Sequence, residues 1–380
     1  MSSDSPLVVF NAHLLAGDTS YRSAGIAVYI AGLLKHLGSA SRDLRFQILL
    51  GGGVLPSGVS LPVTRSRLST RSPWRRILWE QTVLPIVVRR LGASLLHGPA
   101  FAGPLLSSCP QVITVLDLSF LRHPEFFRTG NRLYLSMITG LACRRSAAVI
   151  AISDFTAREV VTLLGVPSER VTTIYPGVAP RFRPIPQADV ARFRAEKGLP
   201  DRYILYLGTL EPRKNLIRLV RAYSQLRDPS LHLVLAGAQG WFFEGIFAEV
   251  ERLGLKERVH FPGYVPADEQ AFWYNAARVF AYVSAYEGFG MPVVEALACG
   301  VPTVTASTTS LPEAGGQGVV AVPPDDEAAI ADALDRVASD SSLRGEMRDH
   351  GMAHAASFTW EETALRTAAV YRQIVDRRLS

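Results

Sequence analysis

The sequence predicts an α/β protein made of two doubly wound domains, and three observations support this fold class. Short apolar runs alternate with amphipathic helical stretches along both halves of the chain, which is typical of parallel sheets covered by helices. The 380 residues are enough for two hydrophobic cores. A proline-rich stretch at 180–186 marks the expected linker. We therefore expect a first domain at residues 1–184 and a second domain at residues 185–361.

The apolar runs give the expected strands in order along the chain. In the first half they lie at residues 6–12, 46–50, 95–99, 112–115 and 147–153, and an amphipathic helix is expected at 25–37. In the second half they lie at residues 203–207, 231–237, 259–265, 279–283, 301–305 and 319–322. The segment 358–362 has the pattern of a helix start, so we expect the chain to end in a helix.

The composition argues against a membrane-spanning or disulfide-rich protein. The sequence contains no run of 18 or more apolar residues, and its first residues carry no signal-peptide pattern. Its three cysteines have no metal-ligand spacing, so we interpret them as buried thiols of a reducing compartment. We therefore expect a cytoplasmic protein.

The charge is divided unevenly between the two halves. Residues 1–184 carry a net charge of +11, almost entirely from arginine, whereas residues 185–380 carry −5. Such an asymmetry suggests that the first half meets an anionic partner. The alternative interpretation is an ordinary solvated surface. No nucleic-acid motif accompanies the charge, so nucleic acid is not expected as a partner.

The most informative stretch runs from Tyr282 to Gly300 and reads as strand, glycine turn and helix. The turn contains Gly288 and Gly290, and the helix after it has proline near its start and Gly300 at its end. The free N–H groups of such a turn and the helix dipole together bind anions. Glu287 and Glu295 flank the turn, and each is suited to accept protons from hydroxyl groups. The alternative is a simple strand-to-helix corner with Glu287 in solvent.

The segment Glu-Gly-Phe-Gly-Met-Pro-Val-Val-Glu resembles the E-x7-E motif of the retaining GT-B glycosyltransferases of family 4. The resemblance extends over nearly the whole chain. It implies two Rossmann-like domains facing a central cleft, with a C-terminal helix at about 362–380 crossing back to the first domain. It also implies that Glu287 and the backbone of the following residues contact the donor sugar, and that Glu295 contacts the ribose. Those following residues are Gly288, Phe289, Gly290 and Met291.

Other donor-binding residues are expected in the second domain. Gly-Thr-Leu-Glu-Pro-Arg-Lys-Asn begins at Gly208 and includes Thr209, and its adjacent cations, Arg213 and Lys214, suit a diphosphate. The segment resembles the family's diphosphate clamp. The backbone around Tyr264 and Val265 is implied to border the nucleotide base.

In the first domain the resemblance is less complete. The family's Gly-x-Gly-x-Tyr segment begins at Gly25, which is implied to approach the donor phosphate, but Ala27 replaces its second glycine. The family's His-Asp-Leu-Ser-Phe-Leu segment, which lines the cleft by the acceptor, has Leu116 in place of histidine. Only Asp117 carries over as a catalytic candidate, and a local hydrogen-bonding role is its alternative.

The implied activity is hexosyl transfer from a nucleotide sugar to an acceptor hydroxyl, with retention at the anomeric carbon. Glu287 is a candidate either as a nucleophile or as a residue that orients the sugar in a front-face mechanism. The sequence has no Asp-x-Asp metal motif, so we expect no cofactor and no metal, with Arg213 and Lys214 stabilising the leaving diphosphate. Two rivals stay open: an inactive nucleotide-sugar-binding protein, and an epimerase or phosphorylase of the same fold.

The strings Asp-Leu-Ser-Phe-Leu and Glu-Pro-Arg-Lys-Asn resemble those of bacterial mannosyltransferases of this family, and the donor and acceptor are predicted from this resemblance. We expect GDP-mannose as donor, ahead of UDP-sugars, and a glycan or lipid-linked acceptor of surface polysaccharide or glycolipid synthesis. The stretch from Arg65 to Arg90 interleaves arginines with Ile77, Leu78 and two tryptophans, Trp74 and Trp79. This pattern predicts a helix that lies on the anionic inner membrane face, and a packed surface helix is the alternative.

Overall fold

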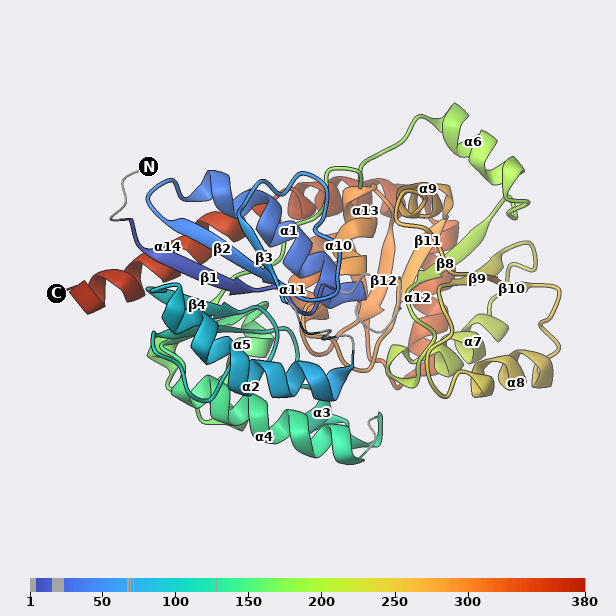
Figure 1. The fold of residues 1–380 in the computed structure, drawn as a ribbon. Helices are drawn as coiled ribbons and strands as arrows, with labels where there is room; N and C mark the ends of the chain where they lie inside the picture. The colour runs from blue at the N-terminus through green and yellow to red at the C-terminus, as the bar shows by residue number, and fades with distance from the viewer. Residues whose placement is uncertain are drawn as a thin grey trace. The chain divides into compact units, whose positions relative to one another are not determined.

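The computed structural model describes residues 5–15, 24–66, 68, 70, 72–126 and 129–379. The chain forms two compact units, the first made of Met1–Gly177 with Thr359–Ser380 and the second of Val178–Phe358 (Figure 1). Both units alternate strands and helices, so the predicted α/β class is confirmed.

The first unit contains a parallel sheet of seven strands in the order β3-β2-β1-β4-β5-β6-β7. The strands are β1 (Leu7–Asn11), β2 (Arg45–Leu50), β3 (Val63–Arg65), β4 (Leu95–Gly98), β5 (Gln111–Val115), β6 (Ala148–Ala151) and β7 (Val171–Thr173). The helices are α1 (Ala24–Ala40), α2 (Pro73–Arg90), α3 (Ser119–Arg122), α4 (Thr129–Arg145), α5 (Asp154–Leu164) and α14 (Trp360–Leu379). The strand order reverses at β1, between β2 and β4, which is the doubly wound plan.

Helices cover both faces of this sheet because successive strand residues point to opposite sides. On one face Val9 and Leu96 pack with Trp79 and Val88 of α2. Further along that face Val149 of β6 packs among residues of α4 and α5. The central strands are buried on both sides, which explains why they read as continuous apolar runs in the sequence.

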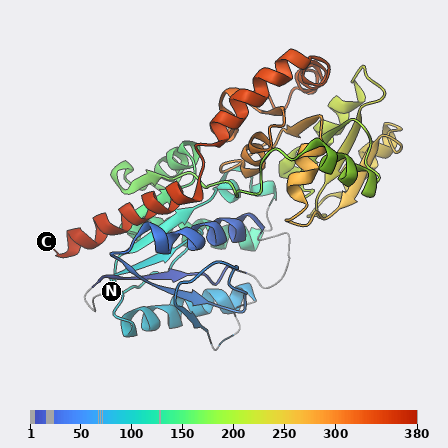
Figure 2. The ribbon, with the colours of Figure 1, turned by 90° about the horizontal axis from the view of Figure 1, so that it is seen from above.

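The opposite face carries α1 and α14, which lie side by side (Figure 2). His97 of β4 is fully buried there, and its two ring nitrogens bond the hydroxyls of Tyr371 at 2.5 Å and Thr114 at 2.8 Å. Burial lowers the pKa of His97 to about 3. Gly32 of α1 touches Trp360, because a Cβ at Gly32 would lie 2.3 Å from the indole ring. The C-terminal helix is therefore a part of the first unit, as the resemblance implied.

The second unit contains a parallel sheet of six strands in the order β10-β9-β8-β11-β12-β13. The strands are β8 (Tyr203–Leu207), β9 (His232–Ala236), β10 (Val259–Gly263), β11 (Val279–Tyr282), β12 (Thr303–Ala306) and β13 (Val319–Val322). The helices are α6 (Gln187–Glu196), α7 (Leu216–Ser224), α8 (Glu244–Arg252), α9 (Gln270–Ala276), α10 (Met291–Ala298), α11 (Leu311–Gly315), α12 (Glu327–Ser339) and α13 (Ser341–Ala355). The order reverses at β8, between β9 and β11, so this unit is also doubly wound.

The α10 helix begins and ends as its sequence predicts. Pro292 stands in its first turn, where the missing N–H costs no hydrogen bond. At the other end Gly300 has a φ of 72°, and the amides of Gly300 and Val301 donate to the carbonyls of Leu297 and Ala296. This pair of bonds is the Schellman motif, which needs a left-handed residue and therefore favours glycine.

One sequence interpretation of α2 is wrong. Trp79 was expected beside the exposed arginines, but it is 5% exposed and stacks on His13, with ring centroids 3.7 Å apart. Trp74, by contrast, is 74% exposed and Leu78 is 64% exposed. Arg67 and Arg71, which belong to the same basic stretch, lie outside the described residues.

The three cysteines are buried thiols. Within the described part of the chain, none of the helices is long and apolar enough to span a bilayer.

The contact between α1 and α14 gives a test of the first unit. We expect Gly32→Val to lower its free energy of unfolding by about 1–3 kcal/mol, because the added carbons would overlap the Trp360 ring. Urea denaturation measures the change. Gly130 of α4 is the control, because a Cβ there would meet no atom within 4 Å. Gly130→Ala should therefore be neutral or stabilising, and equal losses in both variants would contradict this packing.

Candidate active site

The predicted donor-binding residues of the second unit gather at one edge of its sheet. Thr209 follows β8, Tyr264 and Val265 follow β10, and the turn before α10 follows β11. Parallel strands bring their carboxyl ends to the same edge, and ligands of doubly wound sheets bind there. The structure therefore brings together the residues that the sequence placed in separate motifs.

Hydrogen bonds hold the turn before α10 against the loop after β8 and against Ser310. The amide of Ala285 donates to the carbonyl of Arg213 at 2.9 Å, and Ser310 Oγ donates to the carbonyl of Glu287 at 2.9 Å. Gly290 is the N-cap of α10 with a φ of 102°, and a Cβ there would lie 2.6 Å from Leu311. Glycine is required at this position by both conformation and space.

The loop after β8 also depends on glycine. Gly237, which follows β9, has a φ of 147°, and a Cβ there would lie 1.8 Å from the carbonyl oxygen of Gly208. The ends of β8 and β9 therefore approach each other backbone to backbone. The adjacent carbonyl of Thr209 accepts a hydrogen bond from the Tyr206 hydroxyl at 2.8 Å. These contacts fix the path of the chain toward the two cations.

Arg213 and Lys214 form a buried charge cluster with two carboxylates. Lys214 Nζ lies 2.7 Å from Glu287 Oε1, and it also donates to the Tyr282 hydroxyl at 2.8 Å. Arg213 lies 3.3 Å from Glu287 Oε2 and 2.9 Å from Glu211 Oε1. We call these five residues the charge cluster. Its two cations are balanced by two anions.

The charge cluster keeps Glu287 ionised. Glu287 is 7% exposed. Burial alone would raise its pKa, but the charges of Lys214 and Arg213 outweigh burial and lower it to about 2. A carboxylate with so low a pKa is a weak base near neutral pH. Both of its oxygens are occupied by cations in this structure.

Glu295 lies in a different environment, one turn into α10. Its Oε2 accepts a hydrogen bond from the Tyr274 hydroxyl at 3.0 Å. Burial raises the pKa of Glu295 to about 7, against the lowering effects of Arg181 and of Tyr274. Near neutral pH this carboxyl therefore exists in both protonation states. The two glutamates of the E-x7-E pattern have pKa values shifted in opposite directions.

The other residues that are predicted to bind the donor differ in the solvent exposure of their side chains. Tyr264 is 57% exposed, whereas Val265 and Phe289 are buried. Phe289 packs edge-on against Phe358, with ring centroids 5.3 Å apart, so its side chain supports the turn while its backbone borders the site. Met291 is half-buried in the first turn of α10.

The two predicted site residues of the first unit, Asp117 and Gly25, differ in their local surroundings. Asp117 follows β5, and its Oδ1 accepts hydrogen bonds from the amide of Ser119 at 3.0 Å and from its hydroxyl at 2.7 Å. The local role that the sequence left as an alternative is therefore present. Gly25 lies exposed in the first turn of α1, and a Cβ there would meet no atom within 4 Å.

Sequence reasoning missed two members of the charge cluster. Glu211 and Tyr282 were inside quoted motifs but had no assigned role. Glu211 is separated from Arg213 by one residue, which was a usable signal for an ion pair. Tyr282 reaches Lys214 only through the pairing of β8 with β11, which no local pattern reveals.

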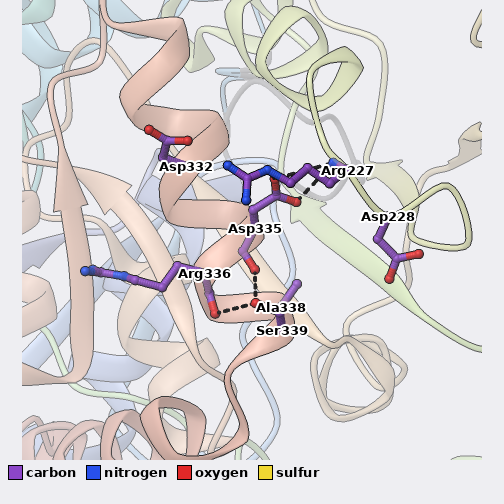
Figure 3. Close-up of a pocket in the computed structure, with 7 residues that line it drawn as sticks. All are labelled: Arg227, Asp228, Asp332, Asp335, Arg336, Ala338 and Ser339. Carbon is purple, nitrogen blue, oxygen red and sulfur yellow. Dashed lines mark hydrogen bonds and ion pairs between the residues drawn. The ribbon is translucent and has the colours of Figure 1, made fainter.

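A surface pocket of about 400 Å³ lies elsewhere in the second unit (Figure 3). It is lined by Arg227, Asp228, Asp332, Asp335, Arg336, Ala338 and Ser339. None of the predicted site residues lines it. Asp335 accepts from the backbone amide of Arg227 at 3.3 Å and lies 3.8 Å from its guanidinium, so this acidic side chain of the pocket is already paired with a basic one.

Comparison with known proteins identifies the family. A family model for glycosyl transferases group 1 matches residues 188–353, and a model for glycosyltransferase family 4 matches residues 23–182. The chain is 32% identical over 283 residues to the O-antigen chain mannosyltransferase B of Escherichia coli, covering 73% of each chain. The chain belongs to the family 4 glycosyltransferases.

Two solved structures show that this glycosyltransferase has the GT-B fold. It is similar to sucrose-phosphate synthase from Thermosynechococcus elongatus, with a TM-score of 0.81, 21% identity, and 98% and 100% of the two chains covered. It is also similar to Anabaena Alr3699/HepE in complex with UDP-glucose, with a TM-score of 0.76, 20% identity, and 97% and 99% covered. The predicted family and fold are confirmed.

The charge cluster gives a stability test. We expect Lys214→Met to destabilise this glycosyltransferase by about 3 kcal/mol, because it leaves a buried carboxylate with one cation fewer. Lys214→Met with Glu287→Gln should recover part of the loss, because the double variant buries neither charge. Denaturant unfolding measures both. The control is Lys197→Met, whose partner Glu269 lies at the same 2.7 Å but at the surface, and which should cost less than about 1 kcal/mol.

The same cluster gives a pH dependence with a defined sign. The pKa of Glu287 is about 2 in the folded state, below its ordinary value of 4.5. Its contribution to stability is therefore complete above about pH 4.5 and is lost as the pH falls toward 2. The stability difference between wild type and the double variant should fade over that window. A difference independent of pH between 2 and 6 would contradict the charge cluster.

Proposed function

We propose that this glycosyltransferase transfers mannose from GDP-mannose to an acceptor hydroxyl, with retention at the anomeric carbon and without a metal ion. The main observation in support of this proposal is the charge cluster beside the N-terminus of α10, at the sheet edge where β8 and β11 end. It places two cations and the carboxylate of Glu287 beside the turn before α10, all within one unit. The acceptor belongs to surface polysaccharide or glycolipid synthesis, and the mannosyltransferase relative supports this choice.

Each donor group has a proposed partner. The diphosphate lies against Arg213 and Lys214, and the ribose diol bonds Glu295. The turn from Gly288 to Met291 supplies backbone amides to the sugar. Thr209 borders the diphosphate, and the backbone at 264–265 borders the base.

Arg213 and Lys214 are paired before the donor arrives, so donor binding must exchange partners. A diphosphate carries negative charge that competes with Glu287 for the same N–H groups. Because Lys214 has three donors and arginine has five, both cations are able to hold a phosphate oxygen and keep a bond to Glu287. The cluster thereby presents the cations in a fixed orientation, which is the main requirement of electrostatic stabilisation.

We propose that Glu287 orients the cations and the sugar and does not attack the anomeric carbon. Both of its oxygens are bonded to cations, and its pKa of about 2 makes it a weak base. In the front-face mechanism the acceptor oxygen bonds to C1 as the bond from C1 to the diphosphate oxygen breaks. The acceptor proton moves to the departing diphosphate, and Arg213 and Lys214 stabilise its charge in place of a metal.

The donor and its ribose contact can be tested together. We expect GDP to bind more tightly than UDP, and Glu295→Gln to weaken GDP binding by about 1.5–3 kcal/mol, because a charge-assisted bond to the ribose is lost. Isothermal titration calorimetry measures both. Glu346→Gln, at an exposed position of α13, is the matched control and should bind GDP like wild type.

Metal independence is tested separately. Mannosyl transfer should persist in excess EDTA, because Arg213 and Lys214 stabilise the leaving diphosphate in place of a metal.

Other outcomes of this experiment would overturn parts of the proposal. Tighter binding of UDP than GDP would reassign the donor, and a UDP-glucose complex is known for a structural neighbour. Activity abolished by EDTA and restored by Mg²⁺ would reject metal independence. GDP binding without turnover against mannosylated acceptors would favour the inactive nucleotide-sugar-binding alternative.

We also propose that the enzyme docks reversibly on the anionic inner face of the cytoplasmic membrane through α2. Trp74 and Leu78, four residues apart on this helix, are among its most exposed apolar side chains. Arg75, Arg89 and Arg90 of the same helix are exposed as well. Tryptophan and leucine enter the headgroup boundary, and each arginine adds about 1 kcal/mol near an anionic surface. A lipid-linked acceptor would place its substrate at that surface.

Liposome flotation tests the docking helix. We expect binding to vesicles that contain anionic lipid, a decrease with salt, and a loss of at least fivefold in Trp74→Ser with Leu78→Ser, about 1 kcal/mol. Phe242→Ser is the control, because Phe242 is 69% exposed in the second unit. Equal recovery of wild type with neutral and anionic vesicles would reject membrane docking and leave glycosyl transfer untouched.

A further inference from the structure

We infer that the first unit holds a hydroxyl-binding site for the terminal sugar of the acceptor, formed by Asn11, His13, Thr70, Arg76 and Glu80. We call these residues the His13 cluster. The inference deepens the proposed glycosyl transfer and rests on it. It assigns a role to residues that lie outside the segments of the family resemblance.

The His13 cluster lies where a doubly wound sheet binds ligands. Asn11 is the last residue of β1, and His13 follows two residues later. Gly51 comes directly after β2, the neighbour of β1. Thr70 precedes α2, which carries Arg76 and Glu80. The cluster is thus at the carboxyl ends of adjacent strands, next to the point where the strand order reverses.

Three buried polar atoms of the cluster have no hydrogen-bond partner among the described residues. They are Nδ1 and Nε2 of His13 and Oγ1 of Thr70. His13 is 5% exposed and Thr70 is 4% exposed. Buried polar groups are nearly always paired, so an unpaired group calls for a bound partner. Here the unpaired atoms come together at one place.

Gly51 shows that His13 and Thr70 face the same point. A Cβ added at Gly51 would lie 2.1 Å from Thr70 Oγ1 and 3.2 Å from His13 Nδ1. Both polar atoms therefore point at the backbone of Gly51 from different elements. Any side chain at this position would displace one of them.

The chemistry of the cluster suits a polyol. Burial, with a further contribution from Arg76, lowers the pKa of His13 to about 4, so its imidazole is neutral near pH 7. A neutral imidazole offers one donor and one acceptor, and the Thr70 hydroxyl offers both. Each hydroxyl of a sugar is likewise donor and acceptor. Neighbouring hydroxyls are therefore able to satisfy all three atoms.

The other members of the cluster argue against an anionic ligand. Glu80 is 5% exposed and accepts from Asn11 Nδ2 at 3.2 Å. Arg76 acts electrostatically on Glu80, and burial is the stronger influence, raising the pKa of Glu80. A phosphate would meet this carboxyl beside the cation, whereas a hydroxyl would donate to it. The stack of His13 on Trp79 holds the imidazole in place.

Two variants remove the unpaired atoms and keep the shape of the side chains. His13→Phe retains the stack on Trp79 but has no ring nitrogen, and Thr70→Val removes only the hydroxyl. The probe is a panel of methyl glycosides of mannose, glucose, galactose and N-acetylglucosamine, observed by saturation-transfer-difference NMR with and without GDP. We expect at least one glycoside to bind wild type and its affinity to fall at least tenfold in each variant.

Stability and nucleotide binding distinguish this result from misfolding. Because the removed atoms have no partner among the described residues, both variants should melt at the same temperature as wild type or higher. GDP binding should be unchanged. The inference would be overturned if no glycoside bound wild type, or if both variants bound the glycoside as tightly as wild type. A lower melting temperature of His13→Phe than of wild type would also overturn it. If wild type did not bind GDP, the proposed function would be contradicted instead. Glycoside binding is measured separately, so the two failures are distinguishable.

Discussion

The proposed donor site depends on one buried interaction, the ion pair of Lys214 with Glu287. A lysine ammonium taken from water is costly unless an anion meets it, and Glu287 lies 2.7 Å away. The pair joins the loop after β8 to the turn after β11, which are neighbouring strands. Arg213 makes a second link between the same segments. Electrostatics therefore fixes the backbone geometry of the turn, and packing at Gly290 completes it.

The same interaction separates the tasks of the two glutamates in the E-x7-E pattern. Glu287 lies between two cations and stays ionised, whereas Glu295 is half-buried beside Tyr274 and its pKa is raised to about 7. Burial raises the pKa of Glu295 to about 7 and outweighs the charge of Arg181 and the bond from Tyr274, so its ionised form is only partly stabilised. Hydroxyl groups that donate to it would favour the ionised form. The proposed ribose contact thus meets a need that the protein leaves open.

Much of the fold and of the donor site could be predicted from the sequence, because local patterns carry them. Apolar runs gave the buried strands, and Pro292 and Gly300 gave the ends of α10. The partners of Lys214 could not be predicted, since they depend on which strands pair. The burial of Trp79 was missed because its neighbours in the sequence are exposed arginines, while its contact with His13 is long-range.

The charge cluster and the His13 cluster differ in how completely their polar groups are paired, and this difference suggests which of the two is preorganised before a ligand binds. In the charge cluster each titratable member already has a partner, so the site keeps its shape without a ligand. In the His13 cluster both ring nitrogens lack a partner among the described residues. A preorganised site loses little freedom on binding, whereas unpaired buried groups gain the most when a ligand arrives. The proposed leaving-group site is therefore built into the fold, and the proposed acceptor site is completed by the acceptor.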